Sequence, residues 1–174
     1  MTTPIYTVGH SNRSLDELVA LLAPFGVKTL VDIRTVPRSR HNPQFNTDSL
    51  GAALAPHGIA YVHLAALGGL RKTRPDSPNG AWRNESFRGY ADHMQTDVFA
   101  RGLQELIALA QPAPTAIMCA EAVPWRCHRS LVADALLARE IPVAHIMSPT
   151  RANPHKLTSF ARVNGVQVTY PALL

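Results

Sequence analysis

Short apolar runs alternate with segments of helical periodicity along most of the chain. Runs rich in β-branched and other apolar residues at 5–8, 29–33, 59–63, 115–119 and 143–147 predict five strands. The run at 29–33 is almost continuously apolar, as in a strand that is covered on both faces. Because strands alternate with helices, the pattern predicts an α/β fold: a mostly parallel sheet flanked by helices, with Rossmann-like or rhodanese-like layering.

The segments between these strands carry helix signals. Ser14 and Glu17 have the spacing of a capping box, and an apolar stripe begins at Leu15. Pro24 and Gly26 end this first helix. Further helices are expected from Asn46 or Thr47 to Ala55, from Phe87 to Met94, from Asp97 to Ala110, and from Cys127 to Arg139.

Two segments depart from this alternation. Residues 68–86 show no periodicity and many Gly, Pro, Asn and Ser residues, so they form either a lid or binding loop, or a disordered segment. Asn164–Gly165, between apolar residues at 160–163 and 166–170, predicts a C-terminal β-hairpin. No repeat or linker suggests a second domain, so residues 1–174 are expected to form one domain.

Composition narrows the class of protein. A chain of 174 residues with 46% hydrophobic and 17% charged residues can bury a core, which excludes a disordered chain, collagen and a coiled coil. No apolar run approaches the roughly 18 residues of a spanning helix, and the start lacks the pattern of a secretory signal. Two cysteines are too few for a disulfide scaffold. We therefore expect a cytoplasmic protein with no membrane partner.

The positive charge of the chain is mostly arginine. Lys and Arg total 17 against 12 acidic residues, a net charge of +5, and lysine occurs only at Lys28, Lys72 and Lys156. The arginine fork matches phosphate and carboxylate oxygens, although a GC-rich genome also yields such a composition. Placement of the arginines therefore carries more information than their number.

Polar residues gather where the predicted strands end. Ligands bind outside the carboxyl ends of the strands in an open parallel sheet. Candidates for catalysis at these ends are Cys127, Glu121, His10, His63 and Asp32. Candidates for anion binding are Arg34, Arg38, Arg40, His41, Asn12, Gly68, Gly69, Arg71, Arg126, His128 and Arg129. These residues follow the ends of four successive predicted strands, at one edge of the sheet, which favours a shared site.

Cys127 is the sharpest of these candidates. At a helix start beside basic residues, its thiol is expected to have a lowered pKa, which suits a nucleophile. The alternative is a semi-buried packing role, which is also the expected role of Cys119. Glu121 is expected to act as a general acid or base, or to pair with Arg129 or Arg34. Asp32 is expected to orient Arg34 rather than to attack a substrate.

Several familiar motifs do not occur. The chain has neither a P-loop nor a dinucleotide fingerprint, so no cofactor is expected. Residues 119–126 imitate a phosphatase or rhodanese loop with one residue too many. Cys127 and His128 are adjacent, unlike spaced zinc ligands, so no metal is expected.

Four segments together carry a family resemblance: TVGHSNRS at 7–14, LVDIRTVPRSRHNPQFN at 30–46, YVHLAALGGLR at 61–71 and MCAEAVPWRCHR at 118–129. They closely resemble the bacterial family named domain of unknown function 488. The resemblance implies a bacterial, cytoplasmic, single-domain protein and selects the loops described above. It does not choose between an enzyme and a binding module.

Three functions follow as hypotheses. The first is a hydrolase or transferase acting on a phosphate-bearing substrate such as a nucleotide or nucleic acid, with Arg34, Arg38, Arg71 and Arg129 on the anion. The second is a nucleic-acid-binding module without catalysis. The third is a redox sensor based on the Cys127 thiol. The oligomeric state is not predictable from the sequence.

Overall fold

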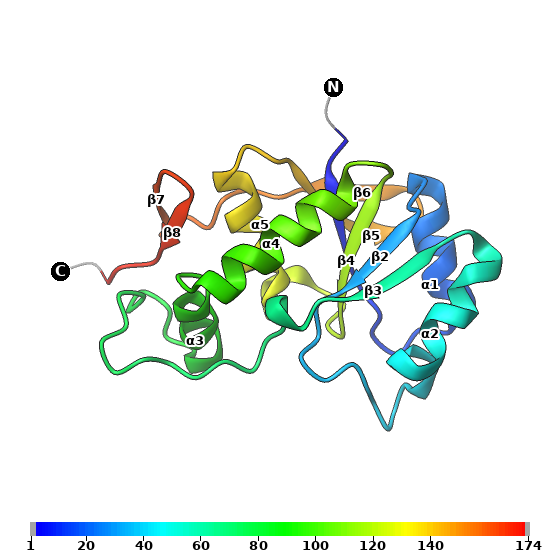
Figure 1. Ribbon diagram of the computed structural model, residues 1–174, viewed down its shortest axis with the longest axis horizontal. Coiled ribbons are helices and arrows are strands. Elements are labelled where there is room, and N and C mark those ends of the chain that lie inside the picture. Colours follow the sequence, from blue (N-terminus) through cyan, green and yellow to red (C-terminus); the bar gives the residue numbers. More distant parts are fainter. Residues whose placement is uncertain (1–2, 173–174) are drawn as a thin grey trace.

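A six-stranded sheet forms the centre of the computed structural model, which describes residues 3–172 (Figure 1). Its strands are β1 (Ile5–Gly9), β2 (Thr29–Asp32), β3 (Ala60–His63), β4 (Thr115–Cys119), β5 (Val143–Ser148) and β6 (Arg151–Pro154). Their order is β3-β2-β4-β1-β5-β6, and only the pairing of β6 with β5 is antiparallel. The fold is therefore the single α/β domain with a mostly parallel sheet that the alternating pattern predicts.

Helices cover both faces of the sheet. The α-helices are α1 (Leu15–Leu22), α2 (Thr47–Leu54), α3 (Glu85–His93), α4 (Asp97–Ala110) and α5 (Arg129–Ala138). Short 3-10 helices are η1 (Ala23–Phe25), η2 (Pro43–Phe45), η3 (Ala55–His57), η4 (Ala65–Leu67) and η5 (Pro124–Arg126). Figure 1 shows α1 and α2 on one side of the sheet and α3, α4 and α5 on the other. Among residues 3–172, no helix has the length and apolar character to cross a membrane.

Each face of the sheet has its own core. Successive residues of a strand point to opposite faces, so Leu30 packs toward α1 and α2 while Val31 packs toward α4 and α5. Leu18 and Leu103 belong to these two cores and are fully buried. The capping box at Ser14 and Glu17 is present as the spacing predicts, with both of its hydrogen bonds made.

Three details differ from the sequence expectation. The edge strand β6 is absent from the predicted pattern because its short, polar sequence has no apolar alternation. Helix α5 begins at Arg129, and Cys127 lies before it in extended backbone after η5. In the hairpin of β7 (Arg162–Asn164) and β8 (Gln167–Thr169), Asn164 pairs with Gln167, which moves the turn one residue on, to Gly165 and Val166. Gly165 takes the positive φ that this turn needs.

The segment between η4 and α3 is an ordered loop rather than a disordered one. Buried Asp92 of α3 accepts hydrogen bonds from the backbone of Arg74, the hydroxyl of Ser77 and the amide of Asn79 at 2.6–2.8 Å. One carboxylate therefore fixes the middle of the loop. In Figure 1 this loop lies beside α3, outside the sheet.

Candidate functional site

A cleft of about 740 Å³ lies where β1, β2 and β4 end. After β1 the chain turns to α1 on one face of the sheet, and after β4 it turns to α5 on the other. Such a reversal between neighbouring strands opens a crevice at the carboxyl edge of a parallel sheet. The sequence-predicted residues that line this cleft are His10, Asn12, Arg34, Arg38, Gly69, Glu121, Arg126, Cys127 and His128.

A glycine allows two of these loops to meet. A Cβ placed on Gly9 would overlap the carbonyl oxygen of Glu121 and would lie 2.7 Å from Nη1 of Arg129. The end of β1 can therefore approach the loop after β4 only because residue 9 has no side chain. Two other residues that line the cleft, Ser11 and Leu70, have positive φ values of 50° and 58°. Uncommon backbone of this kind is frequent at binding and active sites.

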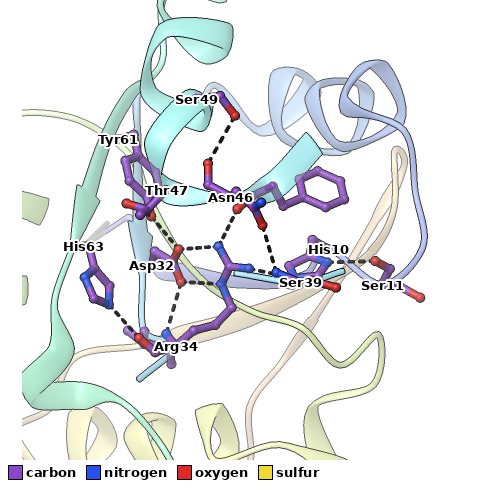
Figure 2. Close-up of polar contacts among 12 residues, drawn as sticks. His10, Ser11, Asp32, Arg34, Ser39, Asn46, Thr47, Ser49, Tyr61 and His63 are labelled. Atoms are coloured by element: carbon purple, nitrogen blue, oxygen red, sulfur yellow. Dashed lines mark hydrogen bonds and ion pairs between the residues drawn. The ribbon is translucent and has the colours of Figure 1, made fainter. Parts of the chain in front are cut away.

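Asp32 and Arg34 form a buried ion pair at the floor of the site (Figure 2). Nε and Nη2 of Arg34 donate to the two carboxylate oxygens at 2.9 and 2.6 Å. Tyr61 donates its hydroxyl to Asp32 at 2.6 Å, and burial, with this hydrogen bond second, raises the pKa of Tyr61 to about 12. Asp32 does not line the cleft, so its place fits the expected role of orienting Arg34.

His10 meets Arg34 from the other side (Figure 2). Its Nδ1 lies 2.7 Å from the carbonyl oxygen of Ser11, which can only accept, so Nδ1 carries the proton. Nε2 therefore accepts from Nη1 of Arg34 at 3.2 Å. Burial lowers the pKa of His10, with Arg34 adding to the effect, and the ring is neutral. Nη2 of Arg34 also donates to the carbonyl of Phe45, so both of its hydrogens are used. The second hydrogen of Nη1 is therefore the one that has no partner within residues 3–172.

Cys127 is joined to Cys119 in a disulfide, which the sequence reading does not anticipate. Both residues are buried and line the cleft. Nε2 of His128 donates to the carbonyl oxygen of Ile33 at 2.8 Å, so its Nδ1 is a free acceptor 3.5 Å from Sγ of Cys127. Burial lowers the pKa of His128 to about 4. The expected free nucleophile exists only after reduction of this disulfide.

The rim of the cleft carries exposed charges. Arg38 pairs with Asp48 at 2.8 Å, and both side chains are well exposed, so the pair is weak. Arg126 and Glu121 also line the cleft and are exposed, in the segment that links β4 to α5. An anionic ligand in the cleft could therefore contact Arg34 at the floor and the exposed side chains of Arg38 and Arg126 at the rim.

Other predicted residues lie elsewhere. Arg129 is fully buried and donates to Thr7, Cys119, Glu121 and Ala122, so it builds the wall of the cleft and does not face a ligand. Arg71 donates to the carbonyls of Gly68 and Ala65. Outside the cleft lining are Arg40, His41, His63, Gly68, Arg71 and Arg129. The expectation that Arg71 and Arg129 hold the anion is therefore replaced by a structural role for each.

His63 and Gly68 support the site from behind. Nε2 of His63 donates to the backbone carbonyl of Arg34 at 2.6 Å. A Cβ on Gly68 would overlap Oγ1 of Thr35, and Thr35 itself donates to the carbonyl of Gly69. These contacts hold the residues after β2 in place, which is a positioning role.

Sequence reasoning missed part of the lining. Leu70, together with Ser86, Phe87 and Tyr90 from α3, also lines the cleft. Leu70 is 84% exposed, and the hydroxyl of Tyr90 donates to the carbonyl of Leu67. The sequence predicts a helix from Phe87 to Met94, but no sequence signal placed that helix beside the strand ends.

No three His, Cys, Asp or Glu side chains within residues 3–172 are grouped so that they could hold a metal ion. Comparison with curated proteins and with solved structures finds no match for the chain. A family model, described as domain of unknown function DUF488, matches residues 14–136. This match spans the loops after β2 and β4 and most of the cleft lining. The chain belongs to the DUF488 family.

Proposed function

We propose that the cleft at the carboxyl edge of the sheet is the active site of a hydrolase or transferase that acts on a phosphate-bearing substrate. The observation that carries the proposal is the meeting of Arg34, from the loop after β2, with Glu121, Cys127 and His128, from the segment after β4, in one cleft. In keeping with the family resemblance, we place this activity in the bacterial cytoplasm.

Each residue has a role in this proposal. Arg34, Arg38 and Arg126 hold the phosphate oxygens. After reduction, Nδ1 of His128 takes the proton of the Cys127 thiol, and the thiolate attacks phosphorus. A sulfur–phosphorus bond forms while the ester oxygen leaves with a proton from Glu121. Water or an acceptor hydroxyl, which gives its proton back to Glu121, then attacks phosphorus, and the sulfur leaves as the thiolate.

Binding is tested first with inorganic phosphate, by titration calorimetry on the reduced protein. The double variant Arg38→Ala/Arg126→Ala is expected to bind phosphate at least about tenfold more weakly, because each hydrogen bond to a charged group contributes about 1.5–3 kcal/mol. Arg162→Ala, on exposed β7, is the matched control and should bind as the parent does. Equal affinity in all three proteins contradicts the anion site.

Catalysis is tested with p-nitrophenyl phosphate and with nucleoside monophosphates as substrates. Cys127→Ser is expected to abolish turnover, and Glu121→Gln to slow it about 100-fold or more. Turnover that survives both changes refutes the assigned chemistry. If no turnover occurs, but long DNA binds with a steep salt dependence that survives both changes, the chain is a nucleic-acid-binding module instead.

The disulfide favours a second candidate, a thiol-based redox switch. Arg129 is a buried cation with no carboxylate within salt-bridge distance among residues 3–172, and its Nη1 lies 3.1 Å from Sγ of Cys119. After reduction this charge favours a thiolate at Cys119, so Cys119, and not only Cys127, is activated. Disulfides in cytosolic proteins are usually transient and catalytic or redox-sensing.

In this switch, peroxide accepts two electrons and two protons from the two thiols and yields water. Mass spectrometry after alkylation is expected to find both cysteines labelled in the reduced protein and neither after peroxide. Phosphate turnover should stop on oxidation and return with dithiothreitol. Turnover that is the same in both states rules out the switch.

A further inference from the structure

A second cavity of about 480 Å³ is lined by other residues of the segment 122–128 than the first cleft. Ala122 and Arg126 line the first cleft, while Pro124 and Trp125 line the second cavity. Its volume falls within the range of about 300–1,000 Å³ that is usual for small-molecule sites. One short segment thus lines both the first cleft and the second cavity, so that a single ligand could span the two.

Both tryptophans of the chain line this second cavity. Trp82 is held in place by ring contacts with Phe87, Phe160 and Tyr170, at centroid distances of 4.8–5.5 Å. Trp125 is 65% exposed, which is unusual for so large an apolar side chain. The fixed indole of Trp82 and the exposed indole of Trp125 therefore give the cavity two aromatic surfaces on which a planar ring can stack.

The two histidines of the cavity have no nitrogen left for a ligand. Nε of Arg129 donates to the hydroxyl of Thr7, which lies 2.6 Å from Nδ1 of His145. Nε2 of His145 lies 2.8 Å from Nδ1 of His155, and Nε2 of His155 donates to Asp134 at 2.8 Å. All four ring nitrogens are therefore engaged by groups of the protein. The rings contribute aromatic surface to the cavity.

Other cavity residues offer hydrogen-bond donors. Oδ1 of Asn153 accepts from Nε of Arg151, which leaves the side-chain N–H groups of Asn153 for a ligand. Within residues 3–172, the hydroxyl of Thr158 makes no hydrogen bond and the ammonium of Lys156 makes no ion pair. The cavity thus combines aromatic walls with donors, which suits a flat ring whose edge carries acceptor oxygens and nitrogens.

We infer that the second cavity binds the nucleobase of the ligand whose phosphate occupies the first cleft. This inference rests on the proposed function for the phosphate position, but it is carried by the aromatic walls and donors of the second cavity. A nucleobase is a planar ring with an acceptor-bearing edge, and the backbone between base and phosphate would cross the segment 122–128. The substrate class is therefore a nucleotide, free or within a single strand.

Intrinsic fluorescence tests the base site directly, because every tryptophan of the chain lies at it. Reduced protein is titrated with adenosine, guanosine, cytidine and uridine, with their 5′-monophosphates, and with inorganic phosphate. At least one nucleoside is expected to quench the fluorescence, its monophosphate to bind more tightly, and phosphate alone to leave the signal unchanged. A single-stranded tetranucleotide then distinguishes nucleic acid from free nucleotide by its higher affinity.

Variants separate stacking from general effects. Trp125→Ala is expected to weaken nucleoside binding about 5- to 150-fold, the usual effect of removing one stacking ring. Trp125→Phe should restore most of the affinity. Val163→Ala, another exposed apolar residue but on β7, is the control and should bind normally. Circular dichroism verifies that each variant is folded.

The outcomes for the two sites can be told apart. If phosphate binds but no nucleoside alters the fluorescence, or if Trp125→Ala binds as well as the parent, the base site is refuted while the proposed function stands. If a nucleoside quenches the fluorescence but phosphate does not bind, the proposed function fails and the base site remains. Arg38→Ala/Arg126→Ala should remove only the additional affinity of the monophosphate.

Discussion

Two buried arginines, Arg34 and Arg129, lie close to the same cleft in opposite electrostatic situations. Arg34 is neutralised by Asp32 and still lines the cleft with part of its guanidinium. Arg129 has no acidic partner within salt-bridge distance among residues 3–172; its acceptors are a hydroxyl, a sulfur and two carbonyls. Burial lowers its pKa to about 10, so it keeps its charge at neutral pH. The positive charge 3.1 Å from Sγ of Cys119 therefore comes from a residue outside the cleft lining.

Asp32→Asn tests the neutralised arginine and has the largest expected effect. It leaves the buried Arg34 cation without its counter-charge, which typically costs about 3–5 kcal/mol of unfolding free energy. The hydroxyl of Tyr61 also loses a carboxylate acceptor, so the raised pKa of Tyr61 should fall toward its ordinary value. Urea unfolding and ultraviolet titration of tyrosine measure both effects.

Asp48→Asn is the matched control for this change. It removes the partner of Arg38, but both side chains of that pair are exposed. The unfolding free energy should change by less than about 1 kcal/mol. Similar losses in the two variants would show that burial of the Asp32 pair does not matter.

Gly9→Ala tests the position of the other arginine. The added methyl group would meet the carbonyl of Glu121 and Nη1 of Arg129, so both must shift. We expect a loss of about 1–3 kcal/mol, typical of overpacking, and a lowering of the melting temperature by several degrees. Gly51→Ala on α2 is the control of opposite sign, because its Cβ would make only ordinary contacts. A helix gains about 1 kcal/mol from that exchange.

Lowering the pH should reduce the stability of the folded protein through a histidine in each arginine network. Burial lowers the pKa of His145, next to Thr7 and Arg129, to about 3, and it also lowers the pKa of His10 beside Arg34. The unfolded chain then binds protons that the folded chain does not, so stability is complete above pH 6.5 and declines as the pH falls below it. Each such histidine contributes a slope of about 1.4 kcal/mol per pH unit until its folded pKa is reached.

Urea unfolding from pH 7.5 to 4.5 measures this slope. His145→Asn should be less steep than the parent over the whole acid range, whereas His57→Asn, which changes an exposed histidine, should match the parent. If His145→Asn has the parent slope, His145 is not held neutral in the folded protein.

The sequence predicts the fold well because the buried parallel strands have a strong signature. Continuous apolar runs such as 29–33 mark strands covered on both faces, and parallel pairing then fixes where the loops converge. His10, Arg34 and Glu121 were predictable for that reason. The edge strand β6 was not predictable, because it pairs with β5 alone and its polar sequence lacks a continuous apolar run.

The partners of individual side chains were less predictable. Nothing in its spacing shows that Arg129 turns inward to Thr7, which lies 122 residues away. Nor does the spacing of Cys119 and Cys127 indicate a disulfide, because the backbone of the intervening residues decides whether the two sulfurs meet. The second cavity depends on β6 and on Trp82 from the long loop, so a pattern analysis of single elements could not find it.

The link from Tyr170 to Asp134 has a consequence for the order of events during synthesis. The fully buried hydroxyl of Tyr170 donates to Asp134 at 2.7 Å across 36 residues of sequence, and its backbone N–H donates to Asn79 across 91. A nascent polypeptide can form the sheet earlier, but it cannot complete this polar interior until residue 170 has left the ribosome. Until then Oδ2 of Asp134 and Oδ1 of Asn79 lack the donors that Tyr170 supplies.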